Sequence, residues 1–348
     1  MAKILRETYE GLSKQQQVFV AGASVLATAG VACGAAWWWY RKKTPSELVF
    51  KPVGKLSTIF IHPIKSCRGQ EVTMAECTPT GLRGDNGLFD RNFIILDEND
   101  NKVTLRMEPT LALVLPSLSE DGKRFILEAP GMDTLDVSFA EITSSTNPIL
   151  KFRMWRLDSS GLYCGQRCEA WISTYLGKQG SRLAYFKQGV IADRILQQDT
   201  RWGHRFTDEK LGGYTELSQY NVATEASLED LNTRLEKPAS MRSFRPNLVV
   251  SGTGAFDEDN WKYLKIGDTV VLRRSHTCGR CILVTVDPET GVKNSDNEPL
   301  KTLKEYRLLD KSLPDSKVWG KTYPVFGSNL QCEVTGQVRV GDIVYAVM

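Results

Sequence analysis

Two thiols and a guanidinium stand close together in the segment His276-Thr277-Cys278-Gly279-Arg280-Cys281. A thiolate is both a nucleophile and a ligand for soft metals, and a neighbouring cation favours the thiolate form. Four kinds of site fit this pattern: a structural zinc site, a redox dithiol, a pair of inert buried cysteines, and a thiolate ligand of a redox-active metal. The spacing alone leaves all four open.

The rest of the chain bears on each alternative. A zinc site needs four ligands, and a second pair could come only from Cys164-x-x-x-Cys168, whose spacing is loose. A thioredoxin-like dithiol favours a cysteine at the start of a helix, whereas the apolar run Ile282–Val286 predicts a strand. Inert cysteines remain plausible, because free cysteine often packs as a small hydrophobe.

Further cations and amides lie at the ends of predicted strands. They occur in His62-Pro63-Ile64-Lys65-Ser66-Cys67-Arg68-Gly69, in Asp90-Arg91, in Phe244-Arg245-Pro246-Asn247 and in Val325-Phe326-Gly327-Ser328-Asn329. Guanidinium and ammonium groups suit a phosphate, and Ser and Asn can recognise the edge of a heterocycle. Each segment alone fits a surface ion pair or a capped turn, but together they indicate one loop-lined pocket.

Short strands must position these segments. Strands are predicted at Lys55–Ile61, Asn92–Asp97, Leu248–Ser251, Thr269–Arg273 and Ile282–Val286, and as a pair within Val338–Val347 joined at Gly341-Asp342. Helices are predicted at Glu169–Leu176 and at Thr224–Leu235, where Thr224 is the N-cap candidate. Thr44–Gly54 has the composition of a linker. Many strands and few helices predict an α+β, mainly β fold built on a β-barrel.

The N-terminal region contains an uncharged run from Val18 to Tyr40. At about 1.5 Å per residue, this run is long enough to cross a hydrocarbon core about 30 Å thick. Aromatic residues end it, and Arg41, Lys42 and Lys43 follow, which favours a cytosolic C-terminal side. A cleaved secretory peptide is the rival interpretation, but the basic cluster lies on the wrong side for export. We therefore expect residues 1–43 to form a signal anchor with a transmembrane helix.

Charge and cysteine content narrow the class of protein. The net charge is +3, but residues 1–43 contain six basic and two acidic side chains, which leaves −1 for the remainder. A nearly neutral globular part argues against nucleic acid as the main partner. The eight cysteines of a chain with an adequate core are more typical of reduced thiols in an intracellular compartment.

Taken together, these segments resemble the MOSC-domain molybdenum enzymes, and among them the mitochondrial amidoxime-reducing components of animals. The resemblance covers the whole chain. Its most specific part is Cys278-Gly-Arg-Cys-Ile-Leu-Val-Thr-Val-Asp-Pro-Glu-Thr-Gly291. It implies an N-terminal MOSC β-barrel domain over residues 50–185 and a MOSC domain over residues 186–348, with the cofactor contacted by both.

The resemblance also implies a molybdenum–molybdopterin cofactor whose metal is bonded to Cys281. The positions that match cofactor contacts in the family are Lys65, Ser66, Arg91, Ser218, Arg245, Asn247, Gly279, Arg280 and Asn329. The chain departs from the family at Glu216-Leu217-Ser218-Gln219, where Asp-Thr-Ser-Pro is usual. Thr253 stands where the family often has a further cysteine, so that position receives no essential role.

The implied activity is reduction of N-hydroxylated compounds, with electrons from NADH through cytochrome b5 reductase and cytochrome b5. The chain has no Gly-x-Gly-x-x-Gly fingerprint after a strand, which agrees with borrowed electrons. We expect no His general base, because His62, His204 and His276 suit structural or surface roles. The implied location is the mitochondrial outer membrane facing the cytosol, and a peroxisomal pool is compatible with the same anchor.

Two other functions stay open at this point. One is a MOSC sulfur carrier in which Cys281 holds a persulfide. The other is a membrane adaptor without activity, although Lys65, Arg91, Arg245 and Cys281 together argue against it.

Overall fold

The computed structural model describes residues 48–348 except 155–156, 192–193, 196–209, 310–314 and 317–321. The chain divides into two compact units, Met1–Val49 and Phe50–Met348. The predicted membrane span Val18–Tyr40 lies outside the described residues. Within the described part of the chain, every helix is too short or too polar to cross a bilayer.

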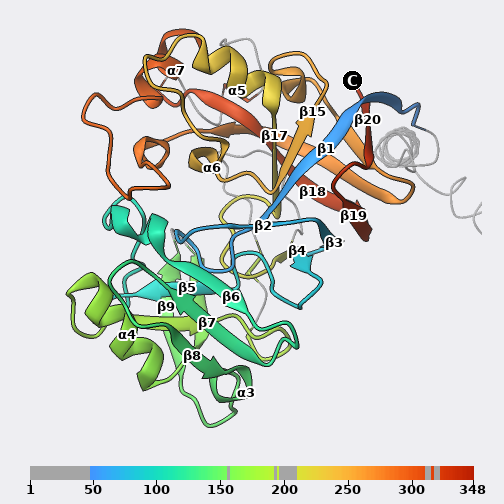
Figure 1. Cartoon of the computed structure of the whole chain (residues 1–348). Helices are drawn as coiled ribbons and strands as arrows, with labels where there is room; N and C mark the ends of the chain where they lie inside the picture. Colours follow the sequence, from blue (N-terminus) through green and yellow to red (C-terminus); the bar gives the residue numbers. More distant parts are fainter. Residues whose placement is uncertain (1–47, 155–156, 192–193, 196–209, 310–314, 317–321) are drawn as a thin grey trace, which may run out of the picture. The chain divides into compact units, whose positions relative to one another are not determined.

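The second unit contains a closed barrel of seven strands (Figure 1). In spatial order these strands are β15 (Leu248–Ser251), β14 (Tyr220–Thr224), β18 (Val325–Val334), β17 (Val270–Gly279), β16 (Tyr263–Ile266), β20 (Ile343–Val347) and β1 (Lys51–Ile61). All neighbours are antiparallel except β14 and β15. The barrel closes because β1 pairs with β20 through its first half and with β15 through its second. The short strand β2 (Gln70–Val72) extends from the end of β1.

Gly54 permits β1 to change partners. A Cβ atom at this position would lie 2.1 Å from the carbonyl oxygen of Ser251, so only glycine fits. The pairing of β1 with β20 also shifts register between Pro52 and Gly54. Lys51–Gly54 is therefore part of a strand, and the predicted linker that extended to Gly54 was wrong over these residues.

Alternating side chains of the barrel strands fill its interior. Leu56 and Ile59 of β1 pack there with Val222, Leu330 and the fully buried Trp261. Apolar burial of this kind is the main favourable term in folding. The mainly β fold built on a barrel is therefore confirmed. The division into domains at residues 185 and 186 stays a prediction. Strand β1 precedes this boundary in the chain, yet it contributes to the same core as the strands that follow it.

A second lobe, mostly green in Figure 1, is formed by the residues from β5 to β11. One sheet joins β5 (Phe93–Leu96), β11 (Arg182–Tyr185), β10 (Leu157–Tyr163) and β9 (Ile149–Met154), and another joins β6 (Leu115–Leu118), β7 (Arg124–Glu128) and β8 (Leu135–Ser138). Helices α3 (Phe139–Ile142) and α4 (Gln166–Leu176) belong to this lobe. Phe93 and Phe125 stack at 4.5 Å between ring centroids in its core, which also contains Trp171.

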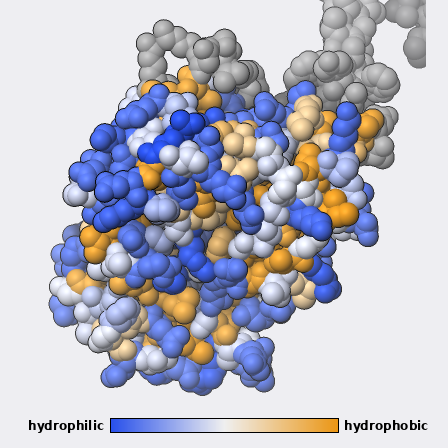
Figure 2. Space-filling view, turned by 45° about the horizontal axis from the view of Figure 1, so that its top comes forward, coloured by the Kyte–Doolittle hydropathy of each residue, from blue (hydrophilic) through white to orange (hydrophobic). Residues whose placement is uncertain are grey.

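Shorter elements complete the unit. A third sheet joins β19 (Gly336–Arg339), β3 (Met74–Thr78) and β4 (Gly81–Gly84), and β12 (Arg194–Ile195) pairs with β13 (Lys210–Leu211). The remaining helices of the described residues are α5 (Glu225–Asn232), α6 (Met241–Phe244), α7 (Leu300–Tyr306) and the 3₁₀ helices η2 (Pro109–Leu113), η4 (Asp257–Asp259) and η5 (Ile282–Thr285). Figure 2 shows a face where hydrophilic and hydrophobic residues intermix, as folded chains commonly present.

Most predicted elements are confirmed. The predicted helices correspond to α4 and α5, and the Thr224 hydroxyl caps α5 by accepting a hydrogen bond from the Ser227 amide at 3.2 Å. The C-terminal strand pair corresponds to β19 and β20. The predicted strand after Cys281 was wrong, because those residues form the 3₁₀ helix η5.

The reason for this difference is tertiary packing. The Val284 amide donates to the Cys281 carbonyl at 3.1 Å, which closes a tight turn. Val284 packs in a cluster with Phe244 and Phe326, whereas Val286 packs in the core of the second lobe. A strand would not place these two valines in different cores, so the turn overrides the β propensity of the run.

Glu258 is a fully buried carboxyl group on η4. It accepts hydrogen bonds from the Ser227 hydroxyl at 2.9 Å and the Thr224 hydroxyl at 3.1 Å. Burial, reinforced by the charge of Asp259, raises the pKa of Glu258 from 4.5 to about 7. Because the folded state binds this proton more tightly than the unfolded state, the stability that Glu258 contributes falls as pH rises from about 4.5 to about 7.

Glu258→Gln should remove this pH dependence. Between pH 4.5 and pH 8, we expect the free energy of unfolding of the variant to gain about 2–3 kcal/mol relative to the parent protein. Urea unfolding of both proteins at the two pH values measures this change. A difference between the two proteins that is the same at both pH values would contradict the assignment.

Candidate active site

Cys281 lies at the junction of the two lobes. It follows the last residues of β17 and is the N-cap residue of η5, with its side chain partly exposed. Nη2 of Arg106, a residue of the second lobe, donates a hydrogen bond to the Cys281 sulfur at 3.2 Å. The contact joins two residues that are 175 positions apart in the chain. Cys281 is therefore partly exposed, and its sulfur lies beside a cation.

Cys278 is also partly exposed, but it differs from Cys281 in its electrostatic environment. Burial raises the pKa of its thiol, although the charge of Arg280 opposes this shift. Cys164 and Cys168 are buried in the core of the second lobe. Among the described residues, no group of three or more His, Cys, Asp or Glu side chains is arranged to hold a metal ion. The geometry thus distinguishes Cys281 from the other thiols and does not support the zinc alternative.

Arg280 connects three elements around the end of β17. Its Nε donates to the Phe326 carbonyl at 2.8 Å, its Nη1 to the Phe244 carbonyl at 2.6 Å and its Nη2 to the Asn221 side-chain oxygen at 3.0 Å. The guanidinium also lies 5.5 Å from the centroid of the Phe244 ring. The residue is buried, so these bonds hold β14, α6 and β18 together next to Cys281.

A chain of buried amides continues from Asn221. Its backbone amide donates to the Asn247 side-chain oxygen at 3.2 Å, and its side-chain nitrogen donates to the Asn329 oxygen at 3.1 Å. Asn329 in turn lies 3.0 Å from Nε2 of His276. The predicted residues Asn247, Asn329 and Arg280 are thereby linked through Asn221, which sequence reasoning missed. His276 has a structural role in this network, as expected.

Three predicted site residues have left-handed backbone conformations. The φ angles are +76° at Ser66, +53° at Arg91 and +53° at Arg245. Residues other than glycine rarely adopt such φ angles, and those that do are concentrated at binding and catalytic sites. Lys65, next to Ser66, is held by a hydrogen bond from its amide to the Phe93 carbonyl at 2.8 Å.

Arg91 and Arg245 are in contact, although they lie far apart in the chain. Arg91 pairs with the buried Asp90 and donates to the Asn247 side-chain oxygen and to the Arg245 carbonyl, both at 3.4 Å. Asp90 also accepts a hydrogen bond from the His62 amide at 2.7 Å. Although burial alone would raise the pKa of Asp90, the charge of Arg91 and the contacts with His62 lower it to about 2. Asp90 is therefore ionised and already bound by Arg91.

The guanidinium of Arg245 differs from that of Arg91, which pairs with Asp90. Its Nη2 atom is buried and, among the described residues, has no hydrogen-bond acceptor. Burial, and then the neighbouring charge of Arg91, lowers the pKa of Arg245 to about 10. A buried nitrogen of a cation without an acceptor costs free energy unless an anion binds there. The site therefore fits a ligand with an anionic group such as a phosphate.

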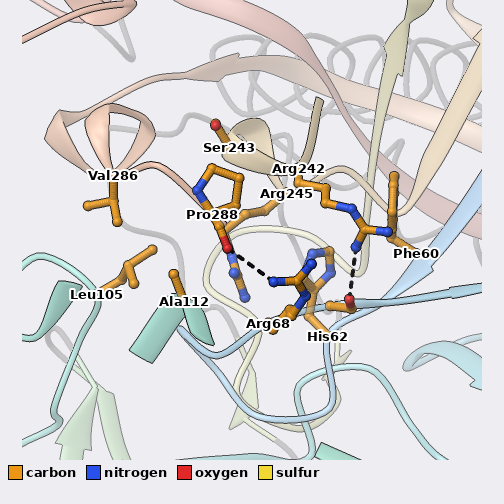
Figure 3. A pocket seen from close by; sticks show the side chains of 11 residues that line it. Phe60, His62, Arg68, Leu105, Ala112, Arg242, Ser243, Arg245, Val286 and Pro288 are labelled. Carbon is orange, nitrogen blue, oxygen red and sulfur yellow. Dashed lines mark hydrogen bonds between the residues drawn. The ribbon is translucent and has the colours of Figure 1, made fainter. Parts of the chain in front are cut away.

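Arg245 also lines a cavity of about 20 Å³ (Figure 3), which accommodates little more than a water molecule. Arg68 and Arg242 lie on the same cavity, but each has an acidic partner, Glu289 at 2.6 Å and Glu71 at 3.0 Å respectively. The ring of His62 is buried there, and burial and the charge of Arg245 lower its pKa to about 3. His62 is therefore neutral, which supports a structural role.

Lys65 and Glu216 form an ion pair near Cys281, with 2.5 Å between Nζ and Oε1. Burial alone would raise the pKa of Glu216, but Lys65, assisted by Arg106 and Lys102, lowers it to about 2. Three cations therefore surround one carboxylate. The hydroxyl of Ser218 instead donates to the Tyr220 carbonyl at 2.7 Å, a contact within its own segment.

Arg106, Glu216 and Asn221 are the residues at this site that sequence reasoning missed. None of them belongs to a motif with recognisable spacing. Glu216 stood in a segment that was noted only for its departure from a family pattern. The fold alone brings Arg106 to Cys281, Glu216 to Lys65 and Asn221 to Arg280, through contacts between residues far apart in the chain.

Comparisons with known proteins cover nearly the whole chain. Residues 53–179 match the family described as MOSC N-terminal beta barrel domain, and residues 208–345 match the MOSC domain. Mitochondrial amidoxime-reducing component 1 of Homo sapiens is 40% identical over 324 residues, which cover 93% of this chain and 92% of that protein. Mitochondrial amidoxime reducing component 2 of Rattus norvegicus is 38% identical over 348 residues, with 97% and 96% coverage.

Proposed function

This chain belongs to the family of MOSC-domain proteins that includes the mitochondrial amidoxime-reducing components, and we propose that it is a molybdenum-cofactor-dependent reductase of N-hydroxylated compounds. Its substrates would be amidoximes, hydroxylamines and N-hydroxyguanidines. One pair of observations supports the proposal: Cys281 is partly exposed, and Nη2 of Arg245, the residue after the Phe244 that Arg280 binds, is buried without an acceptor among the described residues. A soft metal joined to an anionic organic group would satisfy both.

The described residues divide by chemistry among the parts of such a cofactor. Cys281 would bind the metal through its thiolate. Arg245 would hold the anionic end, because guanidinium groups bind phosphate well, and Lys65 and Arg91, which also pair with Glu216 and Asp90, would add positive charge beside it. The polar groups of Ser66, Ser218, Asn247 and Asn329 would recognise the heterocycle, while Gly279 and Arg280 would shape the backbone beside it. When bound, the cofactor supplies the two-electron chemistry, and the protein binds and orients it.

The overall reaction is balanced with two electrons and two protons. An amidoxime would lose its N–O bond, gain two electrons and two protons, and give an amidine and one molecule of water. NADH would supply the electrons through cytochrome b5 reductase and cytochrome b5. Met107 and Ile282, which follow Arg106 and Cys281 in the chain, are exposed and would offer apolar surface to the organic part of a substrate.

We also propose where this reaction takes place. The relatives are named as mitochondrial proteins. With the uncharged run Val18–Tyr40 and the basic residues after it, the site would face the cytosol from the mitochondrial outer membrane, with a peroxisomal pool compatible. Sharing a membrane with the electron donors would raise their effective concentration.

The decisive experiment uses the full-length protein purified in detergent. We expect close to one molybdenum atom and one pterin per chain by mass spectrometry and fluorescence, and NADH-dependent reduction of benzamidoxime when both cytochrome b5 and its reductase are present. Omission of cytochrome b5 is the control and should abolish the reaction. Protein without molybdenum that carries a persulfide on Cys281 would overturn the proposal in favour of a sulfur carrier.

A further inference from the structure

The side chain of Arg106 reaches the Cys281 sulfur from the opposite lobe. Its own segment is well anchored, because the amides of Met107 and Glu108 donate to the Thr104 carbonyl at 2.8 and 2.9 Å. The preceding residue, Leu105, is buried in the core of the second lobe. The backbone that carries Arg106 is therefore fixed on one side of the site, while Cys281 is fixed on the other by the turn of η5.

We propose that Arg106 is a positioning residue for the Cys281 sulfur, which it holds by a hydrogen bond and whose electron density it lowers. The inference rests on the proposed function, since it concerns the sulfur that would bind the metal. Three features of the contact support it: the 3.2 Å separation, the partial exposure of Cys281, and the origin of the two groups on different lobes.

Hydrogen bonds to a ligand sulfur draw electron density away from the metal. They stabilise its reduced state and raise its potential, as known for copper and iron–sulfur sites. A guanidinium suits this role, because its planar donors have fixed directions, whereas an ammonium group is a mobile point charge. Arg106 would therefore favour acceptance of electrons from the donor chain.

Arg106→Gln and Arg106→Lys test this role in the full-length protein. Both variants should retain the parent molybdenum content. In Arg106→Gln, the midpoint potential of molybdenum should shift to a lower value, and kcat for benzamidoxime should fall about 10-fold, the lower end of the effect of outer-shell partners, with little change in KM. Arg106→Lys keeps the charge and should restore part of the potential.

Arg124→Gln is the matched control, because Arg124 is an exposed arginine of the second lobe that pairs with Asp136. It should leave potential, metal content and kcat unchanged. Unchanged potential in both Arg106 variants would overturn the inference and leave the proposed function intact. Loss of molybdenum from folded Arg106→Lys would also overturn it, since Arg106 would then retain the cofactor. Absence of molybdenum from the parent protein would refute the proposed function itself.

Discussion

Cys281→Ala should contain almost no molybdenum and should reduce benzamidoxime more than about 100-fold more slowly than the parent protein. The expected loss exceeds the 10–100-fold effects of outer-shell partners, because the substitution removes the proposed metal ligand itself. The fold should survive, since Cys281 is partly exposed and its carbonyl, which the substitution keeps, accepts the hydrogen bond from Val284 that starts η5. Metal analysis and reduction with the reconstituted electron chain measure the two effects.

Cys278→Ala is the matched control for this substitution. The two thiols are three positions apart, but burial raises the pKa of Cys278, which disfavours its thiolate. We expect it to retain molybdenum and most of the activity. Equal losses in the two variants would point back to a paired-thiol mechanism, and full activity in Cys281→Ala would refute the ligand assignment.

The second large effect is expected at Arg280. Arg280→Met should lower the free energy of unfolding by about 3 kcal/mol, because the change leaves three acceptors of charge-assisted hydrogen bonds unsatisfied in a buried site. These acceptors lie on β14, α6 and β18, so the substitution should also loosen the segment that carries Cys281. Urea unfolding of protein prepared without molybdenum separates this loss from the effect of the cofactor.

Two further variants control for the loss of an arginine and of its charge. Arg124→Met removes an exposed guanidinium and should change the free energy of unfolding by less than about 0.5 kcal/mol. Arg280→Lys keeps a cation but has one donor group in place of three. We expect its loss of free energy of unfolding to lie between those of Arg124→Met and Arg280→Met. If Arg280→Met and Arg124→Met unfold at the same urea concentration, the structural role of Arg280 is wrong.

The helices and strands with regular hydrophobic periodicity were predictable from the sequence. Thr224 followed by apolar residues at helical spacing predicted α5 together with its cap, and the turn at Gly341-Asp342 predicted two C-terminal strands. Such features depend on local hydrogen bonds and on which face a side chain occupies, so a short window contains the information. The run Ile282–Val286 was mistaken for a strand because its residues have high β propensity. Its two buried valines pack in different cores, which a strand would not allow and a short window of sequence does not show.

The sequence by itself determined the chemistry available to this protein: a motif with two thiols, segments bearing Lys65, Arg91 and Arg245, and family membership through their combination. Only the tertiary structure decided which groups meet. It placed Arg106 against the Cys281 sulfur and left Nη2 of Arg245 buried without an acceptor among the described residues. The physical reason is that desolvation and hydrogen bonding depend on neighbours in space, and here those neighbours lie on different lobes, far apart along the chain.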